Sequence, residues 1–228
     1  MLVSPTTPGV YIDEENAFPN KVAHTKALVF DWDGVFNGGH KGEGMHSSFS
    51  EPDSMGLNLV RFGYWLKTGQ LPYAAIMTGA NNPTARAFAK RESLHAVYSK
   101  HIHKSDAIEH FTEKFGVKAN EIAFVYDDVL DLSAARLCGL RFAVKRDASP
   151  LFQQYIQKNK LADYITGCGG HEYAVREVCE LLLGAMGLYD KVVDERSHFS
   201  DLYQNYLATR NAVSPEFFVR QDGKTVVE

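Results

Sequence analysis

The sequence predicts an α/β fold built on a doubly wound parallel β-sheet. Short apolar runs bounded by turn residues recur along the chain, which is typical of buried parallel strands. Segments with apolar residues at helical spacing lie between these runs, and such alternation indicates a parallel sheet with helices on both faces. The expected strands are residues 27–30, 73–77, 96–98, 122–126, 140–144 and 164–165.

Helix signals separate the expected strands. Ser105 is a candidate N-cap, and Gly139 stands at a fitting C-cap position. The segments with apolar side chains at helical spacing are 57–64, 108–115, 132–137 and 175–185.

The chain divides into three segments on composition. Residues 1–22 are rich in proline and polar residues and are expected to form an irregular leader, ahead of one compact domain at 23–187. Within that domain, the glycine-rich stretch 35–53 is too short for a cap domain and predicts a protruding β-hairpin flap. Residues 188–228 are expected to form a helical and hairpin extension, because Asp222-Gly223 between β-prone runs indicates a tight turn.

Composition excludes several classes of protein. Hydrophobic residues make up 45% of the 228, which suits a globular core, and the net charge of -4 with no basic block argues against nucleic acid and anionic membrane as partners. The three cysteines form no paired motif, which favours reduced thiols in a cytoplasmic protein. The longest apolar patch is too short to cross a bilayer, and the first residues lack the features of a secretion signal.

The most informative motif is the pair Asp31 and Asp33, directly after the apolar run 27–30. A buried strand that ends in this way places carboxylates at the carboxyl edge of the sheet, where open α/β sheets bind ligands. Two close carboxylates at that edge suit a hard cation such as Mg²⁺. One of them can also attack phosphorus while the other passes protons.

Three further elements follow the later strands. Thr78-Gly79 offers a hydroxyl and a backbone N–H that can bind a phosphate oxygen. Lys104 precedes a helix, where it opposes the helix dipole, so a buried role with phosphate or a carboxylate competes with simple exposure. Asp127-Asp128, with Asp131 nearby, forms a second acidic strand end, and two such ends in one sheet argue for a metal site.

Taken in order, the segments DWDGV, TG, Lys104 and DD resemble the four motifs of the haloacid dehalogenase (HAD) superfamily of phosphohydrolases, which have a Rossmann-like core. Within it, residues 26–186 resemble the capless 3-deoxy-D-manno-octulosonate 8-phosphate phosphatase family. The supporting segments are FSEPDSMG, VYSKHIHKSDAIEHF and ADYITGCGGHEYAVREVCELLL.

The resemblance implies a role for each matching residue. Asp31 corresponds to the nucleophile and Asp33 to the general acid and base, while Thr78 with Gly79 and Lys104 would bind phosphate. A Mg²⁺ ion would be held by Asp31, Asp127 and the carbonyl of Asp33.

The remaining matches are less direct. Asp128 and Asp131 would support the metal or Lys104 from outside its ligand shell. Asp53, in the segment after the flap, is expected either to contact substrate or to pin the flap.

The resemblance also implies a substrate and an assembly. The expected substrate is a small phosphorylated sugar or sugar acid, of the 3-deoxy-octulosonate 8-phosphate or nonulosonate 9-phosphate type. Capless relatives form tetramers in which a neighbour's flap shields the site, so a homotetramer with residues 35–50 at the interface is expected.

Three positions depart from the family pattern, namely Tyr126 for glycine, Ala80 for arginine, and Asn37 for threonine or serine. Tyr126 and Ala80 leave open a binding or regulatory protein with weak or lost turnover. An open site without a cap also leaves open a phosphatase acting on a macromolecular phosphate.

Overall fold

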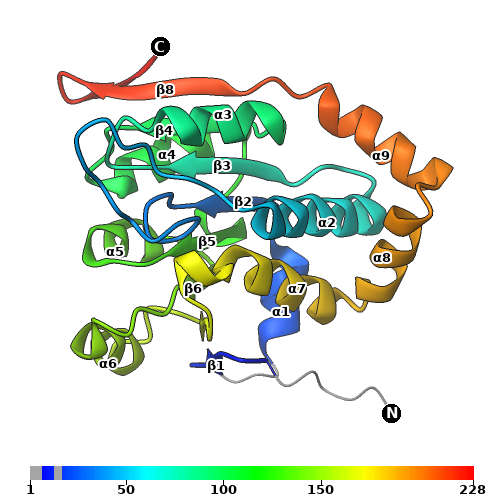
Figure 1. Ribbon diagram of the computed structural model, residues 1–228, viewed down its shortest axis with the longest axis horizontal. Coiled ribbons are helices and arrows are strands. Elements are labelled where there is room, and N and C mark those ends of the chain that lie inside the picture. The colour runs from blue at the N-terminus through cyan, green and yellow to red at the C-terminus, as the bar shows by residue number, and fades with distance from the viewer. Residues whose placement is uncertain (1–6, 13–16) are drawn as a thin grey trace.

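The computed structural model describes residues 7–12 and 17–228, and the strands in that part of the chain form one sheet (Figure 1). The strands are β1 Val10–Tyr11, β2 Ala27–Phe30, β3 Tyr73–Met77, β4 Ala96–Ser99, β5 Ile122–Tyr126, β6 Leu140–Ala143, β7 Tyr164–Ile165, β8 Glu216–Gln221 and β9 Lys224–Val227. The helices are α1 Phe18–His24, α2 Glu51–Thr68, α3 Pro83–Arg91, α4 Lys104–Phe115, α5 Leu132–Ala135, α6 Pro150–Lys158, α7 Ala174–Met186, α8 Tyr189–Ser197 and α9 Asp201–Asn211.

The strand order is β1-β7-β6-β5-β2-β3-β4-β8-β9. Neighbours from β7 to β8 pair in parallel, whereas β1 and β9 add antiparallel edges. This topology confirms the predicted α/β fold. Because β2 lies between β3 and β5, the carboxyl ends of these three strands come together at one edge.

Alternate residues of the central strands supply two separate cores. In β2, Leu28 and Phe30 pack into the core under α1, α2 and α7, whereas Ala27 and Val29 pack into the core under α4 and α5. All four are at most 1% exposed, as expected for a strand with a helix layer on each face. The apolar run therefore fixes the strand in the middle of the molecule and delivers the next residue, Asp31, to its edge.

The leader is more regular than the sequence predicted, as far as the structure describes it. Val10 and Tyr11 pair with β7, and α1 begins at Phe18 with a proline in its first turn, a position that suits proline because its missing N–H needs no partner there. The expectation of irregular backbone through residue 22 was wrong for residues 10–11 and 18–22. Residues 1–6 and 13–16 of that segment lie outside the described part of the chain.

The prediction of a β-hairpin flap at residues 35–53 was also wrong. Residues 38–50 contain no strand and form an extended loop with one turn near Glu43. Four glycines and few β-branched side chains give this stretch little strand propensity. The loop is fixed at its base, because the Trp32 indole N–H donates to Ser47 Oγ at 2.7 Å and the ring packs against Phe49 and Phe88.

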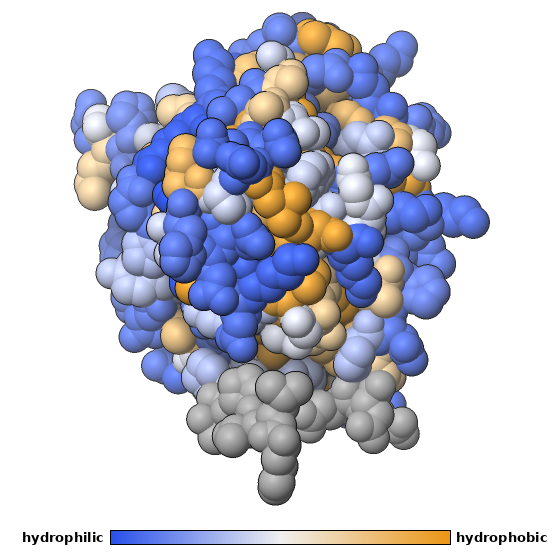
Figure 2. Space-filling model, turned by 90° about the vertical axis from the view of Figure 1, so that its right-hand side faces the viewer, coloured by the Kyte–Doolittle hydropathy of each residue, from blue (hydrophilic) through white to orange (hydrophobic). Residues whose placement is uncertain are grey.

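The C-terminal extension joins the body of the protein. Helix α9 packs Tyr203 and Tyr206 against Phe62 of α2, and the predicted hairpin around Asp222-Gly223 is present. Strand β8 extends the main sheet by pairing with β4, which the sequence did not predict. Figure 2 shows the side of the molecule nearest α8 and α9, where hydrophilic side chains surround an apolar band. No described helix is long and apolar enough to cross a membrane.

Candidate active site

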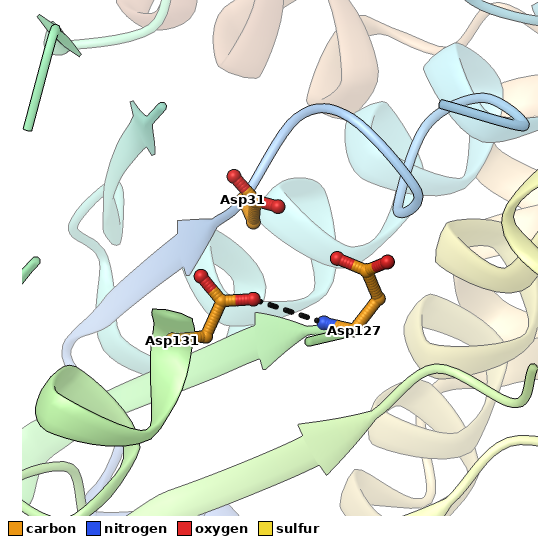
Figure 3. Close-up of side chains that lie close together, drawn as sticks. All are labelled: Asp31, Asp127 and Asp131. Atoms are coloured by element: carbon orange, nitrogen blue, oxygen red, sulfur yellow. Dashed lines mark hydrogen bonds between the residues drawn. The ribbon is translucent and has the colours of Figure 1, made fainter. Parts of the chain in front are cut away.

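Three carboxylates converge at the edge of the sheet (Figure 3). Asp31 follows β2, Asp127 follows β5, and Asp131 ends the short 3₁₀ turn Val129–Asp131. All three residues are buried, and one carboxylate oxygen from each lies within 4.8 Å of the others. The strand pairing explains this convergence, because β2 and β5 are adjacent and parallel and Asp31 N–H donates to the Val125 carbonyl at 2.9 Å.

Asp131, rather than Asp128, completes the cluster. Its Oδ2 accepts hydrogen bonds from the backbone N–H groups of Asp127 at 3.3 Å and Asp128 at 3.1 Å, which fixes the turn. The Asp128 side chain is exposed and accepts from Val129 N–H at 2.6 Å. Asp128 is therefore an N-cap in this structure, and among the described residues its carboxylate forms no ion pair with Lys104.

Lys104 occupies the first position of α4 and is 4% exposed. Its ammonium lies 2.5 Å from Asp31 Oδ1 and also contacts Asp131 Oδ1. Burial lowers the pKa of Lys104, but the two carboxylates outweigh burial and raise it, so the group stays charged. The unfavourable position at a helix N-terminus is thus offset by a double ion pair.

The remaining charges are unbalanced. Burial and the charge of Asp131 raise the pKa of Asp31 to about 6, even though Lys104 lowers it. Burial and the charges of Asp31 and Asp131 raise the pKa of Asp127 to about 8, although the Arg146 guanidinium contacts Asp127 Oδ2 and opposes the shift. Three buried carboxylates with two cations leave negative charge that a further cation would neutralise.

This donor set fits Mg²⁺. The cation prefers carboxylate and carbonyl oxygens and keeps several waters, so few protein ligands suffice. The Asp31 and Asp127 carboxylates can supply two of them, whereas both Asp131 oxygens already accept from protein groups. Burial first, and the neighbouring carboxylates after it, raise the pKa values of Asp31 and Asp127, and a bound cation would oppose both effects.

The phosphate-binding candidate Thr78 follows β3, next to β2. Its Oγ1 accepts from Asn82 Nδ2 at 2.8 Å and from Ala80 N–H at 3.3 Å, so its own hydrogen is left to donate to a ligand. Asn82 Nδ2 also donates to Asp33 Oδ2 at 2.9 Å, and Lys41 of the loop forms a 2.6 Å ion pair with the same oxygen. The other oxygen, Asp33 Oδ1, is buried and has no hydrogen-bond partner among the described residues.

Two other predicted residues have different surroundings. Gly79 is exposed beside Thr78, and a Cβ there would meet nothing within 4 Å. Asp53 is buried in the first turn of α2, where its oxygens accept from Ser50 Oγ at 2.6 Å and from Arg176 N–H at 2.9 Å. Both carboxylate oxygens of Asp53 therefore have protein partners, one of them Ser50 at the end of the loop 38–50.

Sequence reasoning missed Lys41, Asn82 and Arg146, all of which contact predicted site residues. Asn82 offered a signal, because it lies four residues after Thr78 and precedes the proline that begins α3. Lys41 and Arg146 lie in loops and gave no local signal that they would reach the carboxylates.

The comparisons with known proteins agree with this arrangement. No family model matches the chain. The chain is 30% identical over 174 residues to the 3-deoxy-D-manno-octulosonate 8-phosphate phosphatase KdsC of Escherichia coli K12, covering 75% of this chain and 86% of that protein. The chain belongs to this family of HAD phosphatases.

Solved structures show the same relationship. The 3-deoxy-D-manno-octulosonate 8-phosphate phosphatase of Moraxella catarrhalis, solved with a magnesium ion, a phosphate ion and a KDO molecule, is 28% identical with a TM-score of 0.66, covering 79% of this chain and 98% of that one. The cobalt-bound phosphatase of Haemophilus influenzae is 25% identical with a TM-score of 0.60, covering 73% of this chain and 92% of that one. The chain is therefore a HAD-type phosphatase.

Two departures from the family pattern do not disturb the site. The Tyr126 ring points into the core, where its hydroxyl donates to the Leu161 carbonyl at 3.0 Å. Asn37 shapes the turn after Asp33, because its amide donates to the Trp32 carbonyl and its oxygen accepts from Gly39 N–H. Neither side chain replaces a group of the carboxylate cluster.

The raised pKa of Asp127 predicts how stability depends on pH without divalent cations. Its pKa rises from 3.8 to about 8 on folding, so the folded protein binds more protons than the unfolded chain between these values. The contribution of Asp127 to the free energy of unfolding therefore falls as pH rises from about 4 to 8. Denaturation in a chelator should show a steeper fall from pH 5 to pH 8 for the wild type than for Asp127→Asn. Mg²⁺ should raise the free energy of unfolding of the wild type more at pH 8 than at pH 5. Parallel profiles for the two proteins would contradict the placement of Asp127.

Gly34 gives a steric test of the site. Its φ is +91°, and an added Cβ would lie 2.0 Å from Asp127 Oδ2. Gly34→Ala is expected to lower the free energy of unfolding by more than about 1–2 kcal/mol and to weaken Mg²⁺ binding in a calorimetric titration. Gly44→Ala is the matched control, because Gly44 has φ +70° but no atom within 4 Å of its Cβ position. Equal effects of the two substitutions would mean that backbone strain alone, and not the contact with Asp127, causes the loss of stability and of Mg²⁺ binding.

Proposed function

We propose that this phosphatase hydrolyses the phosphate monoester of a small phosphorylated sugar or sugar acid, with Mg²⁺ as its cofactor. The observation that carries the proposal is the buried cluster in which Asp31 and Asp127, at the ends of adjacent strands, meet Asp131, with Lys104 paired to Asp31. The substrate class is supported by the name of the Escherichia coli relative and by the ligands of the Moraxella catarrhalis structure. Compounds of the 3-deoxy-octulosonate 8-phosphate and nonulosonate 9-phosphate type are the first candidates.

In this proposal Asp31 is the nucleophile. One carboxylate oxygen attacks phosphorus, an aspartyl-phosphate forms, and the bond from phosphorus to the sugar oxygen breaks. The Thr78 hydroxyl and Gly79 N–H hold phosphate oxygens, and Lys104 neutralises negative charge beside the nucleophile. A Mg²⁺ ion held by Asp31, Asp127 and the Asp33 carbonyl would offset the repulsion between carboxylate and phosphate.

Asp33 moves the proton. Its oxygen Oδ1 has no hydrogen-bond partner among the described residues and donates a proton to the departing sugar alkoxide. It then accepts one from the water that releases phosphate from Asp31. Asn82 and Lys41 hold the other oxygen, Oδ2, and so orient the carboxyl group.

We also propose a homotetramer, with residues 35–50 at the interface. The loop 38–50 supports this proposal, because it carries Lys41 to Asp33 and exposes Met45 by 61%. A mass measurement by light scattering at micromolar concentration tests it, and a monomer at that concentration would contradict it.

The function is tested by phosphate release from a panel of sugar phosphates and sugar-acid phosphates with Mg²⁺. We expect turnover on at least one member of the panel and loss of that turnover when a chelator removes the metal. No turnover on any member, including an aryl phosphate, would favour a binding or regulatory protein instead. Release from a phosphoprotein but not from sugar phosphates would favour a macromolecular substrate.

A further inference from the structure

A polar cavity lies on the same edge of the sheet as the carboxylates. Its volume is about 240 Å³, and it opens between the loop after β3, the start of α3, the end of β4 and the C-terminal hairpin β8–β9. The side chains that carry its chemistry are Asn81, Arg86, Lys100, Arg220, Gln221 and Glu228. The resemblance to the family covers residues 26–186, so half of these residues come from outside it.

The cavity carries an excess of positive charge. Arg86 is paired with Glu228, and Arg220 forms a 2.6 Å ion pair with Asp106. Lys100 forms no ion pair in the part of the chain that the structure describes, although the contact of Arg86, together with the charge of Lys100, lowers the pKa of Glu228. Arg86 Nε is buried without a hydrogen-bond partner in that part of the chain. Three cations with one lining carboxylate make the cavity suitable for a small anion.

The β8–β9 hairpin, which supplies part of the cavity lining, is held against the end of β4. Ser99, the last residue of β4, lies opposite Val219 of β8, and the residues that follow them, Lys100 and Arg220, both line the cavity. His101 is 1% exposed, and its Nε2 lies 3.0 Å from Thr225 Oγ1 of β9, which ties the hairpin to the end of β4. The tail therefore forms a fixed wall of the cavity.

The lining of the cavity is hydrogen-bonded to the loop after β3, residues 78–82, which carries Thr78 and Gly79. The backbone N–H of Lys100 donates to the Ala80 carbonyl at 3.3 Å, and Asn81, which lines the cavity, precedes the Asn82 that contacts Thr78 and Asp33. Neighbouring strands lie about 4.8 Å apart, so the seam between β4 and β8 is about 5–10 Å from the end of β3. That separation is on the scale of one sugar molecule.

We propose that this cavity binds the carboxylate of the substrate while the phosphate lies at Asp31 and Thr78. The inference rests on the proposed function and narrows its substrate class to phosphorylated sugar acids, which carry these two anionic groups at opposite ends. Lys100 is the main partner of the carboxylate, because Arg86 and Arg220 each form an ion pair with a protein carboxylate and Lys100 forms none among the described residues. Arg220 at the adjacent strand end is a second donor.

The test compares two esters on three proteins. The esters are a sugar-acid phosphate and a sugar phosphate of similar size without a carboxylate. Lys100→Asn removes the charge with a residue that tolerates the φ of +61° at this position. Lys224→Gln, an exposed position of the same hairpin outside the cavity, is the matched control for loss of one positive charge.

We expect Lys100→Asn to raise KM for the sugar-acid phosphate about tenfold or more, with little change in kcat, because a charge-assisted contact is lost. The ratio of kcat/KM between the two esters should fall by the same factor, and Lys224→Gln should keep the wild-type ratio. An unchanged ratio in Lys100→Asn, or an equal fall for both esters, would overturn the assignment.

A binding measurement separates this inference from the proposed function. Calorimetric titration with the unphosphorylated sugar acid should show affinity that Lys100→Asn weakens about tenfold and Lys224→Gln does not. If the wild type hydrolyses esters with and without a carboxylate equally well, the carboxylate site is wrong while the phosphatase function stands. If no ester is hydrolysed, the proposed function fails, and the titration still decides whether the cavity binds a carboxylate.

Discussion

Replacing Asp31 with asparagine is expected to lower kcat by at least about a thousandfold on any phosphate ester that the wild type hydrolyses. The amide keeps nearly the same shape but cannot form the acyl phosphate. Lys104 retains its contact with Asp131, so the fold should persist. Phosphate release at saturating substrate and Mg²⁺ measures the effect, and a thermal melt checks folding.

Asp128→Asn is the matched control for this experiment. Asp128 is an exposed aspartate next to Asp127, and its capping bond to Val129 N–H can be made equally well by asparagine. Its activity should stay within a few-fold of the wild type. Loss of activity in Asp128→Asn but not in Asp31→Asn would contradict the assignment of the nucleophile.

Replacing Lys104 with methionine is expected to have the largest effect on stability. The side chain is almost completely buried between Asp31 and Asp131, and its removal leaves both carboxylates without this cation. Loss of one partner from a buried ion pair costs about 3–5 kcal/mol. Chemical denaturation in a chelator should show a decrease of this size, and phosphate release should be lost as well.

A double variant separates charge from packing in this effect. Lys104→Met with Asp31→Asn removes the cation together with one of its carboxylates, so it should recover part of the stability lost in Lys104→Met alone. A decrease below about 1 kcal/mol in the single variant would mean that Lys104 behaves as a solvent-exposed residue. Additive effects of the two substitutions would mean that the residues do not interact.

The central sheet and the ends of its strands were predictable from the sequence because they depend on local signals. A strand buried on both faces is a continuous apolar run, and the first polar residue after it lies at the sheet edge. Asp31, Thr78 and Asp127 all follow such runs, on strands that pair side by side in the structure. Their meeting at one edge therefore followed from the alternation of strands and helices.

Features that depend on contacts between distant residues were not predictable in this way. Strand β8 pairs with β4 across more than a hundred residues, and Arg146 reaches Asp127 from the loop after β6. The choice of Asp131 over Asp128 as the partner of Lys104 depends on the direction of side chains in a single 3₁₀ turn. Sequence spacing alone does not determine that direction.

The most direct test of the catalytic account is to find the phosphoryl group on the protein during turnover. The Asp33→Asn variant, mixed with Mg²⁺ and a phosphate ester that the wild type hydrolyses, would be quenched in acid and digested for mass analysis. An activated ester such as an aryl phosphate needs little proton donation, so the first step should proceed while the second is slow. We predict one phosphoryl group on the peptide that contains Asp31. A phosphoryl group on another residue, or an unmodified Asp31 peptide while phosphate is being released, would contradict the account.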